Sequence, residues 1–404
     1  MELKINKPYL NGKRLVSKIE YENEKYDLFF EVNEEYKNFL NVETANAFLI
    51  ALLPFAIKHE YNIIIDGFIS SKLYYQLTTY LIPLLCNEFN KKEIKIECKL
   101  TDISYKSTGV GASISCGVDS FYTLLKHCNC QDKTYNITHL TFFNAGSNGQ
   151  YGGDKARELY NKRLKNITKF CKENNFKLIT IDSNMNELIM MNHEKRHTFT
   201  TLACVYALEK LFNKYYFASG LGFNGSHIDE SDTAYYDILN VHCLSNENIS
   251  FYCSGLETTR IEKVKYISNY KMTYDWLNVC VSDSSDNCGI CNKCIRTMAE
   301  LDSINKINLY KNVFDLKYFY KNRSKIYAQI LTNNIDKIQH DFCKEILIEC
   351  KKNKIKIPIS SYIIFAISFK KNIKNIIKRI LPNKTLAKIK NIKSRNKIND
   401  GWMD

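Results

Sequence analysis

The segment from Val110 to Leu125 constrains the fold more than any other part of the chain. Short apolar and small residues lead into a Ser-Cys-Gly-Val-Asp-Ser turn at 115–120, and apolar residues at helical spacing follow it. This order predicts a strand, a tight turn and a helix. The first turn of such a helix presents unpaired N–H groups and a positive dipole end to the loop, so we expect an anion such as pyrophosphate to bind there.

Residues of the turn suit this role individually. Ser115 and Ser120 offer hydroxyl donors, Gly117 allows close backbone approach, and Val118 opens the predicted helix. Asp119 could orient the loop or hold a metal ion on the phosphates. The turn lacks the lysine of a Walker loop and the spacing of the dinucleotide fingerprint. An ordinary glycine-containing turn is the alternative interpretation.

The six residues 115–120 resemble the S-G-G-x-D-S loop of the PP-loop ATP pyrophosphatases, the adenine nucleotide alpha-hydrolase superfamily. Five of the six positions agree, and Cys116 stands where the family has its second residue, glycine. The resemblance implies a HUP-like α/β fold that binds ATP and Mg²⁺. It also implies a reaction in which ATP is cleaved to AMP and pyrophosphate, AMP is attached to a carbonyl oxygen, and nitrogen or sulfur displaces it.

The pattern from Gly109 onward alternates strands with helices. The strands are expected near 138–144, 176–182 and 215–219, and such alternation predicts a parallel sheet with right-handed crossovers. Ligands bind at the carboxyl ends of the strands in such sheets, where Asn144, Asp182 and Gly220 fall. We therefore expect adenine and ribose to contact this edge. Residues 1–105 are predicted to form a small α/β domain packed against the core, 106–302 the nucleotide-binding domain, and 303–404 a helical basic extension.

Two further segments are candidates for ligand contact. Arg196, with His193, Lys195 and His197 beside it, could face the triphosphate or pyrophosphate, although a solvated helix entry is the alternative. The loop 220–237 is rich in Gly and Asp and follows a predicted strand, as substrate loops often do. A solvated loop whose Gly and Asp residues form turns is the other interpretation.

Cys280, Cys288, Cys291 and Cys294 form a C-x7-C-x2-C-x2-C pattern. Four thiolates at this spacing predict a closed structural zinc site, while an iron–sulfur cluster and a chance grouping are the alternatives.

The chain has fifteen Cys but no recognisable secretory leader, so a reducing cytoplasmic location is expected. No apolar run is long enough to predict a membrane span.

The four Cys, together with Thr259-Arg260-Ile261-Glu262-Lys263, make the chain similar to the 7-cyano-7-deazaguanine synthase branch of the superfamily. That branch has a short T-K-x-E motif ahead of a structural zinc site. The resemblance covers about 109–301 and implies an ATP site closed by Zn²⁺. It does not transfer the substrate, because residues 1–105 and the tail have no counterpart there and the loop 220–237 matches only loosely.

Cys116 departs from the family pattern. A Cys at a helix N-terminus can form a stabilised thiolate, which suits covalent catalysis or a persulfide that delivers sulfur. The departure resembles thioamide-forming members of the superfamily, for which a loop Cys is proposed to act. Cys116 could equally be a small residue that replaces glycine without a chemical role.

The tail is strongly basic. Residues 370–397 hold eleven Lys and Arg and no acidic residue, and isoleucines recur at helical spacing. Such a segment could bind RNA or an anionic surface, or be a solvated extension.

Four functions are compatible with these features. The first is an enzyme that adenylates a small molecule and exchanges oxygen for nitrogen or sulfur, with ammonia or a persulfide as donor. The others are an ATP-binding regulator without turnover, a zinc-dependent RNA-binding protein, and an enzyme that modifies tRNA or a protein terminus with a deazaguanine-like group. A homodimer is a further expectation.

Overall fold

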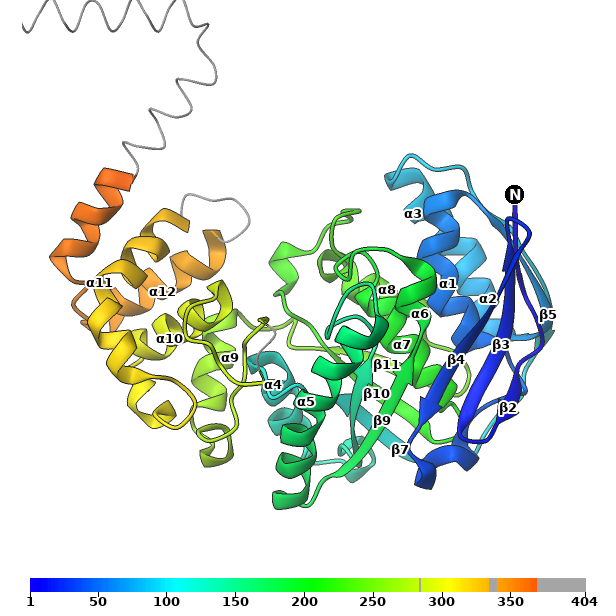
Figure 1. Ribbon diagram of the computed structural model, residues 1–404, viewed down its shortest axis with the longest axis horizontal. Coiled ribbons are helices and arrows are strands. Elements are labelled where there is room, and N and C mark those ends of the chain that lie inside the picture. The colour runs from blue at the N-terminus through cyan, green and yellow to red at the C-terminus, as the bar shows by residue number, and fades with distance from the viewer. Residues whose placement is uncertain (283–284, 334–339, 369–404) are drawn as a thin grey trace, which may run out of the picture. The chain divides into compact units, whose positions relative to one another are not determined.

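The computed structural model describes residues 1–282, 285–333 and 340–368 of the chain (Figure 1). The chain forms two compact units, residues 1–293 and 294–404. The first unit contains an eleven-stranded sheet. The described part of the second unit is helical.

Five parallel strands make up the part of the sheet that includes the turn at 115–120. They are β7 (Gly109–Ser113), β8 (His139–Asn144), β9 (Lys177–Ser183), β10 (Phe212–Ala218) and β11 (Ser250–Ser254). Their order in the sheet is β11-β10-β7-β8-β9. The chain proceeds from β7 to β9 in one direction and returns to the other side of β7 at β10. A reversal of this kind opens a crevice at the carboxyl ends of β7 and β10. The predicted α/β class with a parallel sheet is confirmed.

The small residues of β7 are required by its neighbour β10. A Cβ atom on Gly111 would lie 2.5 Å from the ring of Tyr215, and one on Gly109 would lie 2.6 Å from the carbonyl oxygen of Leu211. The Tyr215 hydroxyl is 2.6 Å from Thr141 Oγ1 and 3.2 Å from Ser113 Oγ. Because Tyr215 crosses β7 to reach these groups, only glycine fits at position 111, while the backbone of Leu211 leaves room only for glycine at position 109.

Helices and short helical turns connect these strands. The helices are α4 (Val118–His127), α5 (Gly153–Glu173), α6 (Met185–Ile189), α7 (His197–Ala207), α8 (Asp237–Cys243) and α9 (Arg260–Ile267). The turns are η3 (Lys133–Tyr135), η4 (Phe223–Gly225), η5 (Thr233–Tyr236) and η6 (Lys271–Thr273). Helix α4 packs on β7, β10 and α9, and α5 packs on β8 and β9. The predicted apolar face of α4 is buried, and its Phe121 ring lies edge-on to Phe170 of α5.

The first 105 residues extend the same sheet. They form β1 (Glu2–Ile5), β2 (Tyr9–Asn11), β3 (Arg14–Tyr21), β4 (Glu24–Val32), η1 (Glu34–Phe39), α1 (Asn46–His59), β5 (Asn62–Ser70), α2 (Ser71–Gln76), η2 (Leu77–Leu81), α3 (Ile82–Glu88) and β6 (Ile96–Thr101). Strand β4 pairs with β9 in antiparallel orientation, with Phe30 opposite Ser183 and Val32 opposite Ile181. Beyond β4 the order is β3-β1-β5-β6. The N-terminal segment therefore shares strand pairing with the parallel sheet, which the sequence patterns did not predict.

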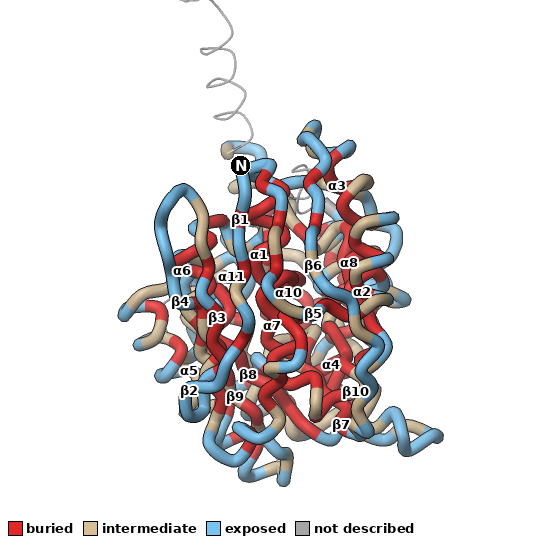
Figure 2. Tube along the Cα trace, turned by 90° about the vertical axis from the view of Figure 1, so that its right-hand side faces the viewer, coloured by how far each residue is buried: buried red, intermediate tan, exposed pale blue. Residues whose placement is uncertain are grey.

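Two features bind this segment to the rest of the first unit. Helix α1 is apolar on all sides and buried along 46–57, as Figure 2 shows, and it packs against α7. Glu209 is fully buried, and its carboxylate accepts hydrogen bonds from side chains of both parts of the unit. The donors are Asn41, Thr44, Asn46, Asn246 and Asn248. Burial raises the pKa of Glu209, and these donors oppose the rise.

The second unit contains α10 (Asn292–Ser303), η7 (Ile307–Tyr310), α11 (Leu316–Asn333) and α12 (His340–Lys352). Within it, the Asp302 carboxylate accepts hydrogen bonds from Tyr327 Oη at 2.6 Å and Arg323 Nη2 at 2.9 Å. The predicted helical character is confirmed for the described part, and the basic segment 370–397 lies outside the described residues. None of the described helices combines the length and the apolar character that crossing a membrane requires.

Candidate functional site

The turn at 115–120 lies at the carboxyl end of β7 and leads directly into α4. Gly117 is the N-cap residue of this helix. Ser120 Oγ donates to the Gly117 carbonyl at 3.0 Å, lies 3.3 Å from Ser115 Oγ, and thereby closes the turn. Val118 is buried at the first helical position and anchors the helix to the core. The predicted strand, turn and helix are therefore present at the sheet's switch point.

Cys116 has an environment that opposes the predicted thiolate. Its side chain is buried, with 3% exposed, and Cys171 of α5 is nearby. Burial raises the pKa of the Cys116 thiol far above its ordinary value, and Cys171 adds to the rise. Its backbone is left-handed, with φ of 58°, a conformation that glycine adopts at little cost. This explains why glycine suits the position and places the thiol on the core side of the turn.

Asp119 forms ion pairs with two cations of α9. Its carboxylate lies 2.8 Å from Arg260 Nη1 and 3.2 Å from Lys263 Nζ, and both basic side chains are almost completely buried. Lys263 Nζ also donates to the Ser219 carbonyl at 2.6 Å, directly before Gly220. Space is open beside the Gly220 Cα atom, where an added Cβ would meet nothing within 4 Å. These contacts bring the turn, the end of β10 and α9 together.

The start of α9 is determined locally. Thr259 and Glu262 form a capping box, in which the Thr259 side chain accepts from the Glu262 backbone and the Glu262 side chain accepts from the Thr259 backbone. This fixes the helix start, and Arg260 and Lys263 on the first turn then reach Asp119. Both cations belong to the segment 259–263 singled out in the sequence, but their position beside the turn at 115–120 was not predicted.

Asn144 and Asp182 are adjacent at the ends of β8 and β9, as expected. They are opposite each other in the strand register, and Asn144 Nδ2 donates to Asp182 Oδ1 at 2.7 Å. The other Asp182 oxygen accepts from Arg157 Nε at 3.0 Å. Asn144 Oδ1 is buried and has no hydrogen-bond partner in the described part of the chain. A polar pair with an unused acceptor therefore lines this edge.

Arg196 connects helix α6 with two loops. It is fully buried, and its guanidinium donates to Asn186 Oδ1 and to the carbonyls of Met191 and Gln150. Burial lowers the pKa of Arg196 to about 10. Because three of its five N–H groups donate to neutral oxygens of the protein, the contacts of Arg196 fit a residue that positions α6 and the neighbouring loops better than one that faces phosphate.

Buried polar groups without partners gather around α7 and α8. Asp237 Oδ1 accepts from Thr198 Oγ1 at 2.5 Å, whereas Asp237 Oδ2 and both side-chain polar atoms of Asn240 have no partner among the described residues. Burial raises the pKa of Asp237 to about 6, although the charge of His197 opposes the rise. His197 Nε2 lies 3.2 Å from Asp232 Oδ1. Unpaired buried polar atoms are costly, so this cluster is a candidate ligand site.

The four predicted cysteines come together. The sulfur atoms of Cys280, Cys288, Cys291 and Cys294 all lie within 4.8 Å of one another, and four sulfur donors at such separations could hold a metal ion such as zinc. The segment leading into Cys280 touches the turn, because Asn278 N donates to the Cys116 carbonyl at 2.8 Å. A metal ion here would thus support the turn through the backbone, with no ligand position open for catalysis.

Comparisons of the chain with protein-family models, with curated proteins and with solved structures gave no match.

Proposed function

We propose that the chain is an ATP-dependent enzyme of the PP-loop type. It would release AMP and pyrophosphate, attach AMP to a carbonyl or carboxylate oxygen of a small molecule, and replace that oxygen with nitrogen or sulfur. The observation that carries this proposal is the turn at 115–120. It joins a helix N-terminus at the sheet's switch point to two buried cations, Arg260 and Lys263.

The phosphates of ATP would bind the backbone N–H groups of the turn and the hydroxyls of Ser115 and Ser120. Without ATP, the Asp119 carboxylate forms ion pairs with Arg260 and Lys263. When ATP binds, its phosphates would take over these cations and leave Asp119 available to Mg²⁺, which stabilises phosphate charge. The ion pairs therefore keep the site assembled for an incoming polyanion.

Two other groups would complete the site. Asp182 and Asn144, at the neighbouring strand ends, suit the hydroxyl groups of ribose and the edge of adenine. Asp237 and Asn240 carry buried polar atoms that a polar substrate would satisfy. The loop 220–237 would thus contact substrate as the sequence predicts.

The environment of Cys116 bears on the choice between nitrogen and sulfur. A buried thiol with a raised pKa is a poor nucleophile, so we propose a packing role for Cys116. Nitrogen or sulfur would then come from an external donor such as ammonia or a persulfide.

The test is ATP binding by the full chain in Mg²⁺, measured by equilibrium dialysis. We expect Lys263→Met to weaken binding about tenfold or more, equivalent to at least about 1.4 kcal/mol. The matched control is Lys265→Met on the same helix, which should bind like the wild type. Asp119→Asn should remove most of the Mg²⁺ dependence. Equal ATP affinity in all four proteins would contradict the proposal.

Turnover separates an enzyme from a regulator. The wild-type chain, incubated with ATP, Mg²⁺ and a small-molecule cell extract, should release AMP and pyrophosphate in equal amounts. ATP binding without AMP release under these conditions would instead identify an ATP-binding regulator.

A further inference from the structure

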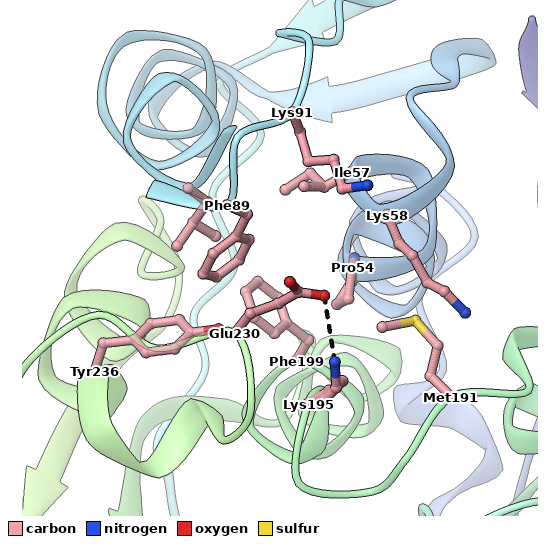
Figure 3. A pocket seen from close by; sticks show the side chains of 11 residues that line it. Pro54, Ile57, Lys58, Phe89, Lys91, Met191, Lys195, Phe199, Glu230 and Tyr236 are labelled. Carbon is pink, nitrogen blue, oxygen red and sulfur yellow. Dashed lines mark hydrogen bonds and ion pairs between the residues drawn. The ribbon is translucent and has the colours of Figure 1, made fainter. Parts of the chain in front are cut away.

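A pocket opens on the first unit away from the turn at 115–120. Its enclosed space is small, about 30 Å³, and its empty space reaches about 410 Å³ only when the open solvent at its mouth is counted. One side comes from the N-terminal segment, with Pro54 of α1 and Phe89 after α3. The other side comes from Met191, from Phe199 of α7 and from Tyr236, as Figure 3 shows. The pocket therefore exists only because the N-terminal segment packs against α7.

The floor of the pocket is apolar. Phe199 and Tyr236 are almost completely buried, and Met191 is 7% exposed. Little of their carbon surface is therefore exposed in this structure, and a ligand would reach it by displacing Glu230. A ligand with an apolar body would gain free energy by covering them.

The mouth carries more positive than negative charge. Lys58, Lys91 and Lys195 surround it, and Glu230 is the acidic residue among its lining residues. Lys195 Nζ pairs with Glu230 Oε1 at 3.3 Å, with the two side chains 34% and 50% exposed. Lys58 and Lys91 have no carboxylate partner within 4 Å in the parts of the chain that the structure describes. Two ammonium groups at the mouth are therefore available to an anion.

Glu230 indicates where that anion would lie. Figure 3 shows its side chain reaching across the apolar floor toward Lys195, with Phe89 and Tyr236 on one side and Met191 on the other. The Glu230 carboxylate thus occupies the mouth. Because the pair with Lys195 is largely exposed, little energy is needed to separate it.

We propose that this pocket binds a small monocarboxylate with an apolar body. The ligand carboxylate would replace Glu230 at Lys195 and face Lys58 and Lys91, while its aliphatic or aromatic body covers Phe199 and Met191. A carboxylate matches the site because the protein's own carboxylate already occupies it. The proposal concerns binding alone and does not depend on ATP chemistry.

The pocket adjoins the candidate site along the chain. Lys195 immediately precedes Arg196, and Tyr236 immediately precedes Asp237. The Met191 carbonyl accepts a hydrogen bond from Arg196 Nε at 3.1 Å. An occupant would therefore contact segments that also shape the polar cluster around Asp237.

The experiment is a ligand-detected NMR titration of the full chain without ATP, using 3-phenylpropionate and its neutral amide, 3-phenylpropanamide. We expect the carboxylate to bind at least about fivefold more tightly than the amide, and added salt to reduce the difference. The double variant Lys58→Gln/Lys91→Gln should weaken carboxylate binding about three- to tenfold. Glu230→Gln should strengthen it about two- to fivefold, because it frees Lys195.

Matched controls lie close by in the chain. Lys92→Gln and Glu93→Gln make the same charge changes at exposed positions outside the pocket and should leave carboxylate binding unchanged. General electrostatic attraction would respond to every such change of charge, so the absence of an effect in the two controls separates this site from it. Equal binding of acid and amide, no saturation up to about 10 mM, or effects of the controls as large as those of the pocket variants would overturn the proposal.

Discussion

Replacing Asp237 by Asn should stabilise the first unit at neutral pH while harming any ligand site there. The Asp237 carboxylate is 2% exposed, and Oδ2 has no hydrogen-bond partner within the described residues. An amide has nearly the same shape and can still accept the hydrogen bond from Thr198. The substitution therefore removes a costly buried charge and keeps the packing.

The expected magnitude follows from the pKa. Burial raises the pKa of Asp237 from 3.8 to about 6. A difference of about 2 between the folded and unfolded pKa values corresponds to roughly 3 kcal/mol. The protonated carboxyl contributes this stability below pH 3.8, and the contribution is lost as pH rises through about 6. Asp237→Asn should thus match the wild type near pH 4 and exceed it by up to about 3 kcal/mol at pH 8.

Trp276 provides a suitable probe, because it lies in the first unit and the only other tryptophan is Trp402. In a Trp402→Phe background, urea unfolding followed by Trp276 fluorescence would report this unit alone. The free energy of unfolding would be measured between pH 4 and 8 for both proteins.

The control is Asp66→Asn at an exposed position of β5, whose stability difference from the wild type should not vary with pH. A constant difference for Asp237→Asn across this range, or a loss of stability at pH 8, would refute the reasoning. Either result would mean that Asp237 is paired or hydrated in its charged form.

Three further predictions concern other parts of the molecule. Glu209→Ala should lower the free energy of unfolding of the first unit by about 3 kcal/mol or more in urea, because the amide donors around it lose their shared acceptor. Glu209→Gln should lower it by less. Cys116→Gly should raise the free energy of unfolding by about 1 kcal/mol in urea, since glycine fits the left-handed backbone. A lower free energy of unfolding would show that the packing of the thiol outweighs the strain. Metal analysis should find about one zinc ion per chain. A strong chelator should lower the thermal unfolding midpoint and weaken ATP binding, and Cys288→Ser should have the same effects without chelator.

The sequence was sufficient to predict the features that depend on residues close together in the chain. Alternating strand and helix patterns predicted the parallel sheet, since such connections allow few other arrangements. The predicted strand at 138–144 corresponds to β8, and the spacing of the four cysteines predicted their grouping. Each of these depends on short-range periodicity or on a compact motif.

Features set by distant pairings could not be predicted. Asp119 meets Arg260 across 141 positions, and no local pattern indicates that contact. The burial of the Cys116 side chain depends on the left-handed turn and on its packing near α5, which an argument from the helix dipole does not take into account. The sequence patterns predicted an N-terminal α/β domain packed against the core, but no local pattern indicates that β4 and β9 pair in one sheet.

The pairing of β4 with β9 has a consequence for synthesis of the chain. Val32 leaves the ribosome 149 residues before its partner Ile181. During that interval β4 presents unpaired backbone groups, and long-range pairing of this kind forms slowly. The N-terminal segment should therefore need protection by a chaperone on the ribosome, and a stall between the two strands should leave it prone to aggregate.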